Sequence, residues 1–135
     1  MPTQSQHEPE HEHVKILREI MAQFGTLFDR CPDGIYVYID DVHKTCNEKL
    51  AKMHGTTVDE WQRCESIVDT YAEPEDRAVI VNHYMQTVQG LGSPVRFQYR
   101  ARRQDGSVFK AELDMVPFTW GGNSVALHFV REVKK

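Results

Sequence analysis

The sequence predicts an α+β domain: a five-stranded antiparallel sheet with short helices on one face, preceded by an N-terminal helix. Three observations predict this class. Residues 94–131 hold three segments in which apolar and polar residues alternate, which is the period of half-buried strands. Two shorter strand-like segments lie within residues 35–46. Between these two groups, residues 47–89 carry helix-capping residues and apolar residues at helical spacing.

The chain begins with a polar segment, residues 1–12, which we expect to be a disordered tail. His7, His11 and His13 could form a loose metal-binding cluster. The tail offers no Cys and no buried partner that would fix a ligand geometry. We therefore predict a solvated tail and no metal site.

Residues 13–30 are predicted to form an amphipathic helix. Its apolar residues recur at alternating spacings of three and four, which is the a/d seam of a helix that packs along one stripe. Two heptads are too few for a free coiled coil. The seam therefore packs on the sheet of its own domain, or pairs with the same helix of a second chain, and both can hold. The seam consists of Val14, Leu17, Met21, Phe24 and Phe28, and Ile20 and Leu27 widen it.

Short elements follow the N-terminal helix. Residues 31–34 (CPDG) break the chain, residues 35–39 form a strand, and residues 43–46 return beside it after the turn at Asp40 and Asp41. The residues from 31 to 135 are expected to form one domain, because 135 residues are enough for a single core.

Helix caps mark the helices that come next. Asn47 is a good N-cap for a helix that runs to about Met53 and ends at Gly55. Thr57 and Glu60 have the spacing of a capping box, which starts a further helical turn. Later helical segments contain Trp61, then Ile67, Val68 and Tyr71, then Pro74 at the first position of a longer helix whose apolar side is Ala78, Val81, Met85 and Val88.

The last three strands can be placed in register. Asp105 and Gly106 mark the turn between the first two strands. A two-residue loop would set charged residues against the apolar face, whereas an odd-length loop with Gly106 at positive φ pairs apolar residues with one another. The predicted pairs are Ala101 with Phe109, Tyr99 with Ala111, Phe97 with Leu113, Arg96 with Asp114 and Arg100 with Lys110.

Six short motifs in this order resemble the PAS domain family of sensory modules, over about residues 22–133. They are PDGIYVYIDD, NEKLAKMHG, TTVDEW, PEDR, RARRQDGSVF and VALHFVREV. The resemblance implies a five-stranded sheet with an internal cavity between the sheet and the helices. It also implies sensing, by a ligand or by a partner protein, rather than catalysis.

The sequence gives no reason to expect an enzyme. It contains no GxSxG, P-loop or HExxH pattern, and we identify no catalytic residue. The chain is instead expected to be the regulatory part of a two-component histidine kinase, a cyclase or a transcription regulator. Its net charge of -4 and its lack of a long apolar run argue against nucleic-acid binding and membrane insertion. Three cysteines without CxxC spacing suit a reducing cytoplasm.

Two cofactors known in the PAS family fit this sequence poorly. A haem ligand would have to be His83, but its position is about 200° from Val81 on the helix, so we expect it to point away from the apolar side. In flavin-binding members of the family, the thiol that bonds the flavin lies in an Asn-Cys-Arg pattern. In this chain Cys64 is followed by Glu65 and Ser66, without the neighbouring Asn and Arg. A small organic ligand, or none, remains.

The predicted cavity faces are apolar and partly aromatic, and a filled core would have the same composition. Tyr99 is the most informative member, because a buried hydroxyl needs a hydrogen-bond partner. The outer face carries Arg96, Arg100, Arg102 and Arg103, which are expected to be solvated or to dock an acidic partner or the N-terminal helix. The candidate cavity residues are Met53, Trp61, Ile67, Met85, Val88, Phe97, Tyr99, Leu113 and Met115.

Two functions are compatible with these patterns. In the first, the domain senses a ligand or strain in the sheet and passes the signal through its N-terminal helix, as a homodimer, to a partner protein or a fused effector domain. In the second, it is a constitutive protein–protein interaction domain with a filled core.

Overall fold

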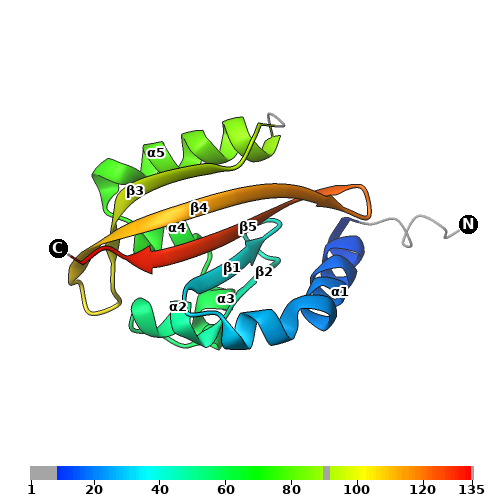
Figure 1. The fold of residues 1–135 in the computed structure, drawn as a ribbon, viewed down its shortest axis with the longest axis horizontal. Coiled ribbons are helices and arrows are strands. Elements are labelled where there is room, and N and C mark those ends of the chain that lie inside the picture. The colour runs from blue at the N-terminus through cyan, green and yellow to red at the C-terminus, as the bar shows by residue number, and fades with distance from the viewer. Residues whose placement is uncertain (1–8, 90–91, 135) are drawn as a thin grey trace, which may run out of the picture.

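The computed structural model describes residues 9–89 and 92–134, and it confirms the predicted α+β class. The five strands form one antiparallel sheet in the order β2-β1-β5-β4-β3, so the last strand lies in the middle (Figure 1). The elements are α1 (Pro9–Arg30), β1 (Gly34–Tyr38), β2 (Lys44–Cys46), α2 (Glu48–Met53), α3 (Val58–Arg63), α4 (Ile67–Tyr71), α5 (Pro74–Tyr84), the π-helical turn η2 (Met85–Gln89), β3 (Val95–Arg102), β4 (Val108–Trp120) and β5 (Asn123–Glu132).

The predicted register of β3 and β4 is confirmed at each pair. Ala101 lies opposite Phe109, and Arg96 lies opposite Asp114. Gly106 has a φ of +93°, the left-handed conformation that the odd-length loop requires. Arg100 and Lys110 do face each other as predicted. The like charges are tolerated because the Arg100 guanidinium binds the Asp76 carboxylate at 2.9 Å.

The predicted helix caps are also present. The side chain of Asn47 accepts a hydrogen bond from the Leu50 amide at the start of α2, and Thr57 accepts one from Glu60 at the start of α3. Pro74 occupies the first turn of α5. Ser66, which the sequence analysis did not identify as a cap, accepts from Asp69 at the start of α4.

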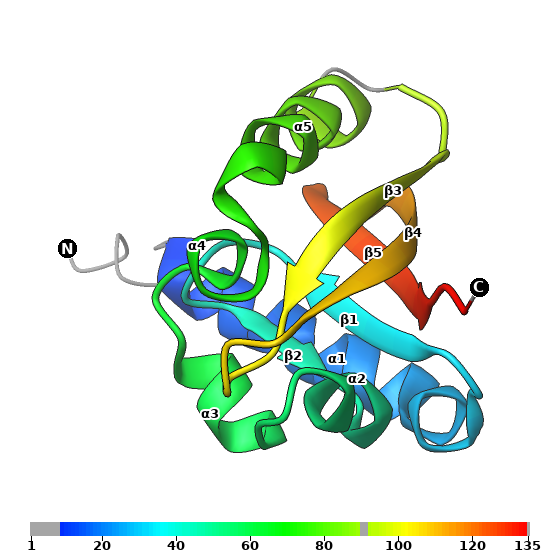
Figure 2. The same cartoon turned by 90° about the vertical axis from the view of Figure 1, so that its left-hand side faces the viewer.

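Two hydrophobic clusters lie on opposite faces of the sheet. The larger one joins α2, α3, α4 and α5 to the concave face, and the smaller one joins α1 to the outer face of β1 and β5 (Figure 2). The leading helix therefore forms a third layer. This confirms that α1 packs on the sheet of its own domain, which was one of the two alternatives for the apolar seam.

The residues that make this contact differ from the predicted seam. Ile16, Ile20 and Phe28 are buried against β1 and β5, while Val14, Phe24 and Leu27 remain 43%, 38% and 45% exposed. Leu17 and Met21 are partly buried beside them. The prediction therefore holds for Phe28 and Ile20, and in part for Leu17 and Met21. It is wrong for Val14, Phe24 and Leu27, because the sheet receives a stripe that is shifted toward Ile16. The helix also begins at Pro9, so residues 9–12, predicted as tail, are helical; the rest of that tail, residues 1–8, lies outside the described residues.

The predicted apolar side of α5 is also wrong. Ile80 faces the core, whereas Val81 and Met85 are 48% and 51% exposed. Ala78 is exposed as well. Val88 is buried as expected, because the π-helical turn inserts an extra residue and shifts the helical phase.

Candidate functional site

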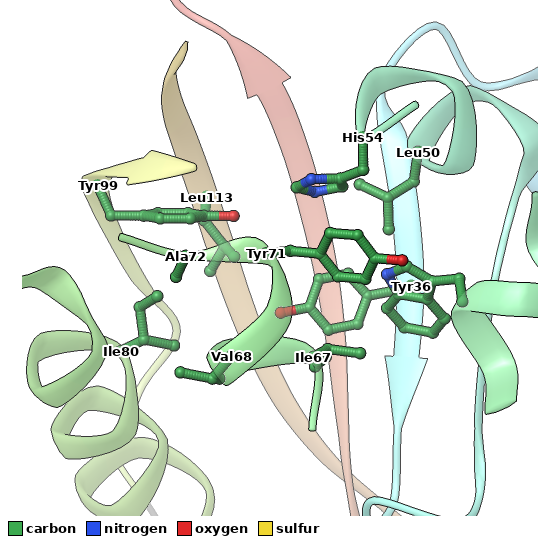
Figure 3. A pocket seen from close by; sticks show the side chains of 11 residues that line it. Tyr36, Leu50, His54, Ile67, Val68, Tyr71, Ala72, Ile80, Tyr99 and Leu113 are labelled. Atoms are coloured by element: carbon green, nitrogen blue, oxygen red, sulfur yellow. The ribbon is translucent and has the colours of Figure 1, made fainter. Parts of the chain in front are cut away.

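A small cavity lies between the sheet and helices α2, α3, α4 and α5. Its volume is about 30 Å³, which is enough for one water molecule. The side chains of Tyr36 and Tyr99 point their hydroxyl groups toward it from opposite sides (Figure 3). Burial raises the pKa of both phenols, so both remain neutral and can donate or accept a hydrogen bond.

A larger cleft of about 630 Å³ opens next to this cavity, between α4, α5 and the sheet. This volume is in the range of sites for small organic molecules. Its inner wall consists of the buried side chains of Tyr36, Met115 and His128. Asp69 and Arg77 line it on the helical side, and the Arg77 guanidinium donates to the Asp69 carbonyl oxygen at 2.7 Å. The cleft therefore has an apolar base and polar groups along one side.

His128 stacks on Tyr36 in the inner wall of the cleft. The two ring centroids are 3.9 Å apart and the rings are nearly parallel, at 10°. Burial lowers the pKa of His128 to about 3, so the imidazole is neutral at physiological pH. Its Nδ1 atom is buried without a hydrogen-bond partner among the described residues.

Two strands separate the cleft from α1, and both are buried on their two faces. In β1, Tyr36 faces the cleft while Ile35 and Val37 pack against α1. In β5, which pairs with β1, His128 faces the cleft while Leu127 and Phe129 lie on the α1 side. Neighbouring residues of the same strands therefore contact the cleft and the leading helix.

The predicted cavity residues divide between the two cavities. Trp61, Ile67, Tyr99 and Leu113 line the small cavity. The cleft is lined by Met115, by Ile67 again and by Met85, although half of the Met85 surface is exposed. Three predicted residues line neither of these cavities: Met53, Val88 and Phe97.

Sequence reasoning missed several residues that line these cavities. The alternation in the β1 segment could have identified Tyr36 and Tyr38, and the alternation in β5 could have identified His128. The two residues of α5, Ile80 and Tyr84, could not be found in this way, because the phase of α5 was assigned incorrectly. The missed residues include Tyr36, Tyr38, Leu50, His54, Val68, Tyr71, Ile80, Tyr84 and His128.

The two residues considered for cofactors lie outside both cavities. The His83 ring stacks on Phe97 of β3, with centroids 4.2 Å apart. His83 does point away from Val81, but Val81 lies on the exposed side of α5, so His83 faces the sheet. The phase error in α5 explains this result. The thiol of Cys64 lies within 3.1 Å of the Thr70 hydroxyl. Neither side chain is positioned to hold a group bound in the cleft.

The arginine stripe on the outer face is paired within the chain. Arg96 binds Asp114 at 2.6 Å, and Arg102 and Arg103 bind Glu73 and Glu132. Together with the Arg100–Asp76 pair, these contacts neutralise much of the stripe. The leading helix docks elsewhere, on β1 and β5.

Solved structures resemble this fold along most of the chain. A PAS domain from Colwellia psychrerythraea has a TM-score of 0.68 at 20% identity, with 84% of this chain and 97% of that chain covered. The chain has the PAS fold. A domain of a sensory box sensor histidine kinase/response regulator from Geobacter sulfurreducens gives 0.64 at 19% identity, covering 85% and 96%. The PAS domain, in complex with ethanol, of a LuxR-family transcriptional regulator from Burkholderia thailandensis gives 0.65 at 14% identity, covering 82% and 96%.

Sequence comparisons add nothing to this assignment, since no protein-family model and no curated protein match the chain. Within the described part of the chain, no helix combines the length and apolar character needed to cross a bilayer.

Proposed function

We propose that this PAS domain is a sensory module that passes the occupancy of its cleft to α1. The observation that carries this proposal is that β1 and β5 form the wall between the two. A molecule that contacts Tyr36 or His128 presses on strands whose next residues, Ile35 and Phe129, support the helix. Because a close-packed interior transmits strain, a small shift of these strands changes the docking of α1.

The lining supports a small, mainly apolar ligand with one polar group. The apolar base would bury the apolar part of the ligand. The polar group of the ligand could reach the neutral hydroxyl of Tyr36, or Asp69 and Arg77 on the helical side of the cleft. The PAS domain from Burkholderia thailandensis, which was crystallised in complex with ethanol, supports a small ligand that has one polar group. We propose no haem or flavin, because His83 and Cys64 lie outside the cleft.

The first experiment asks whether the purified protein carries a ligand. Intact mass is measured under native and denaturing conditions, together with an absorption spectrum. Extra mass that is lost on denaturation supports the proposal, and the released compound can then be identified and added back. If the two masses agree, addition of a fragment library should stabilise the wild type more than the variant Met115→Trp, which fills the cleft. Val108→Trp is the matched control, since Val108 lies on the same strand but is 46% exposed and lines neither cavity.

The second experiment tests the connection to α1. Hydrogen exchange in residues 14–28 should change when the ligand binds, and Met115→Trp should produce a change without any ligand. An unchanged exchange pattern in α1 with the cleft fully occupied would contradict the proposed route.

We also propose that the domain functions as a homodimer through the exposed side of α1. Among the residues that the structure describes, four of the eight exposed large apolar residues lie on α1 or beside it, at Val14, Phe24, Leu27 and Val42. A groove of about 240 Å³ separates α1 from the edge strand β2. In sedimentation, Val14→Asp combined with Leu27→Asp should convert a dimer into a folded monomer. A dimer that survives both changes would exclude this surface.

The alternative is a constitutive interaction domain with a filled core. It is favoured by one observation: the small cavity between the sheet and the helices has a volume of only about 30 Å³. Under this alternative, cleft-filling variants leave both the exchange of α1 and partner binding unchanged. In either case we propose a regulatory role toward a partner protein or a fused effector domain. The three cysteines, Cys31, Cys46 and Cys64, are free thiols, which supports a reducing, cytoplasmic environment.

A further inference from the structure

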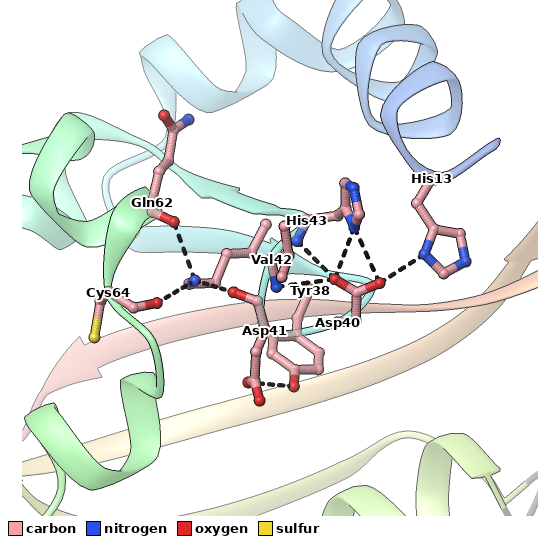
Figure 4. A network of polar contacts seen from close by, with 9 residues as sticks. His13, Tyr38, Asp40, Asp41, Val42, His43, Gln62 and Cys64 are labelled. Carbon is pink, nitrogen blue, oxygen red and sulfur yellow. Dashed lines mark hydrogen bonds and ion pairs between the residues drawn. The ribbon is translucent and has the colours of Figure 1, made fainter. Parts of the chain in front are cut away.

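A cluster of two histidines and one aspartate joins α1 to the turn between β1 and β2. Asp40 lies between the two imidazoles (Figure 4). Its Oδ2 atom is 2.6 Å from Nδ1 of His13, and its Oδ1 atom is 2.8 Å from Nδ1 of His43. The two imidazole rings meet edge to face with their centroids 5.3 Å apart. One potential ligand atom from each of the three residues lies within 4.8 Å of the others.

The surroundings hold the central carboxylate in place. Asp40 accepts hydrogen bonds from the backbone amides of Val42 and His43, at 2.9 and 2.7 Å. These two hydrogen bonds hold the carboxylate group of Asp40 in position between the imidazoles. Hydrogen bonds of this kind orient the ligands of metal sites.

Lysine and arginine side chains do not pair with this carboxylate in the described part of the chain. Lys44 follows His43 directly, but its ammonium group donates to the backbone carbonyl oxygens of Asp41, Gln62 and Cys64. The partners of Asp40 in ion-pair distance are the two imidazoles. The cluster therefore offers one fixed negative charge and two nitrogen ligands.

We propose that His13, Asp40 and His43 bind a divalent transition metal of the Zn²⁺ class. Two imidazoles and one carboxylate are the three protein ligands of many zinc sites, with water in the fourth position. Tetrahedral Zn²⁺ with bonds of about 2.0–2.1 Å needs ligand atoms about 3.3 Å apart. With Oδ2 of Asp40 as the ligand atom, the observed separations of 2.6 Å to His13 and 3.0 Å to His43 would open by a few tenths of an ångström. The nitrogen ligands of the two histidines lie within 4.8 Å of each other and would move closer together. Solvent can supply the fourth ligand, because the Asp40 side chain is 39% exposed.

Such a site would fasten the first turns of α1 to the edge of the sheet. His13 belongs to the helix, whereas Asp40 and His43 belong to the β1–β2 turn, 27 and 30 positions further along the chain. Sequence reasoning found no partner for His13 because the fold alone brings these residues together. Metal binding would then favour the docked position of α1, whether or not the cleft binds a ligand.

The test uses the full chain without an affinity tag, stripped of metal by a chelator, and titrated with ZnCl₂ in a calorimeter. One Zn²⁺ per chain is expected, with a higher unfolding temperature and slower hydrogen exchange near His13. Co²⁺ should compete for the site and give the visible spectrum of a four-coordinate ion. His13→Gln and His43→Gln should each weaken the affinity at least about tenfold, since even the loss of supporting residues costs that much.

Two control variants decide the assignment. His83→Gln removes a half-buried histidine of α5 that lies outside the cluster, and it should bind Zn²⁺ as the wild type does. The double variant His7→Ala, His11→Ala should also retain one site. Absence of Zn²⁺ binding by the wild type overturns the proposal and leaves a metal-free hydrogen-bonded cluster. Binding that survives His13→Gln, or that disappears in the double variant, overturns it as well. His13→Gln changes a partly buried residue near the start of α1, whereas His43 is buried, so His13→Gln should fold even if His43→Gln does not.

Discussion

Replacement of Asn47 by alanine should destabilise the domain much more than the loss of a helix cap. The Asn47 side chain is buried and makes four hydrogen bonds to three segments of the chain. Its Oδ1 atom accepts from the amides of Leu50 in α2 and Ile35 in β1, at 2.9 and 3.1 Å. Its amide group donates to the carbonyl oxygens of Phe28 in α1 and Asp33, at 3.0 and 3.1 Å. One side chain thus fixes the end of α1 to the sheet and to α2.

The magnitude follows from these contacts. Loss of the cap on α2 costs about 1 kcal/mol. The Ile35 amide is left buried without this partner, which adds about 1–3 kcal/mol. The carbonyl oxygens of Phe28 and Asp33 also lose a hydrogen-bond donor. The expected loss in the free energy of unfolding is therefore roughly 3–4 kcal/mol, a large fraction of the ~5–15 kcal/mol by which a typical domain is stable.

Thr57→Ala provides the matched control. Thr57 also caps a helix of six residues, but its side-chain oxygen accepts only from the Glu60 amide and lies at the surface. Its expected cost is about 1 kcal/mol. Urea unfolding followed by circular dichroism measures the free energy of unfolding of both variants, which should share the m-value of the wild type. Equal destabilisation by the two variants would refute the view that Asn47 connects three segments.

Three further predictions concern pH, packing and ligand polarity. Burial lowers the pKa of His54 to about 4 and that of His128 to about 3, below the ~6.5 of an unfolded histidine. The free energy of unfolding is therefore unaffected by these two groups above pH 6.5, and it falls by roughly 1.4 kcal/mol per pH unit for each histidine as the pH drops toward 4. His54→Gln should make the urea midpoint less dependent on pH between 6.5 and 4.5, and an unchanged slope would contradict this. Gly34→Ala should cost about 1–3 kcal/mol in the same urea assay, because its Cβ would approach Leu50 to 2.9 Å, and a neutral result would show that Leu50 can move. Tyr99→Phe should reduce the affinity for a polar ligand, measured by titration calorimetry with the compound released from the wild type, and equal affinities would remove Tyr99 from the site.

The antiparallel hairpins could be predicted because their information is local. The side chains alternate with a period of two, and a slip of one residue between β3 and β4 would set Ala101 opposite Lys110 and Tyr99 opposite Glu112, with charge on the apolar face. The caps at Asn47 and Thr57 depend on two or three neighbouring residues, so they too could be found. The odd-length loop at Gly106 follows from the same local pairing.

The faces of the helices could not be predicted with the same certainty. In α1, Ile16 and Phe24 both belong to apolar stripes, and only the position of the outer surface of β1 decides that Ile16 is buried. In α5, the π-helical turn changes the phase between Ile80 and Val88, and no local signal marks it. The His13–Asp40–His43 cluster depends on this same docking of α1, and it was missed for the same reason.

The position of β1 and β5 explains why a domain of this size can connect two surfaces. A strand that is exposed on one face can relax toward solvent when its other face is pushed. Here both faces are filled, since Val37 and Val125 are fully buried on the α1 side while Tyr36 and His128 are buried on the cleft side. Displacement of the Tyr36–His128 stack therefore has to be accommodated by α1 or by the strand pairing. The pairing of β1 with β5 is held by backbone hydrogen bonds, whereas α1 is held mainly by side-chain packing and a few polar contacts such as Trp120 to Glu19. Under the proposed function, we therefore expect the helix to be the layer that moves at the lower cost.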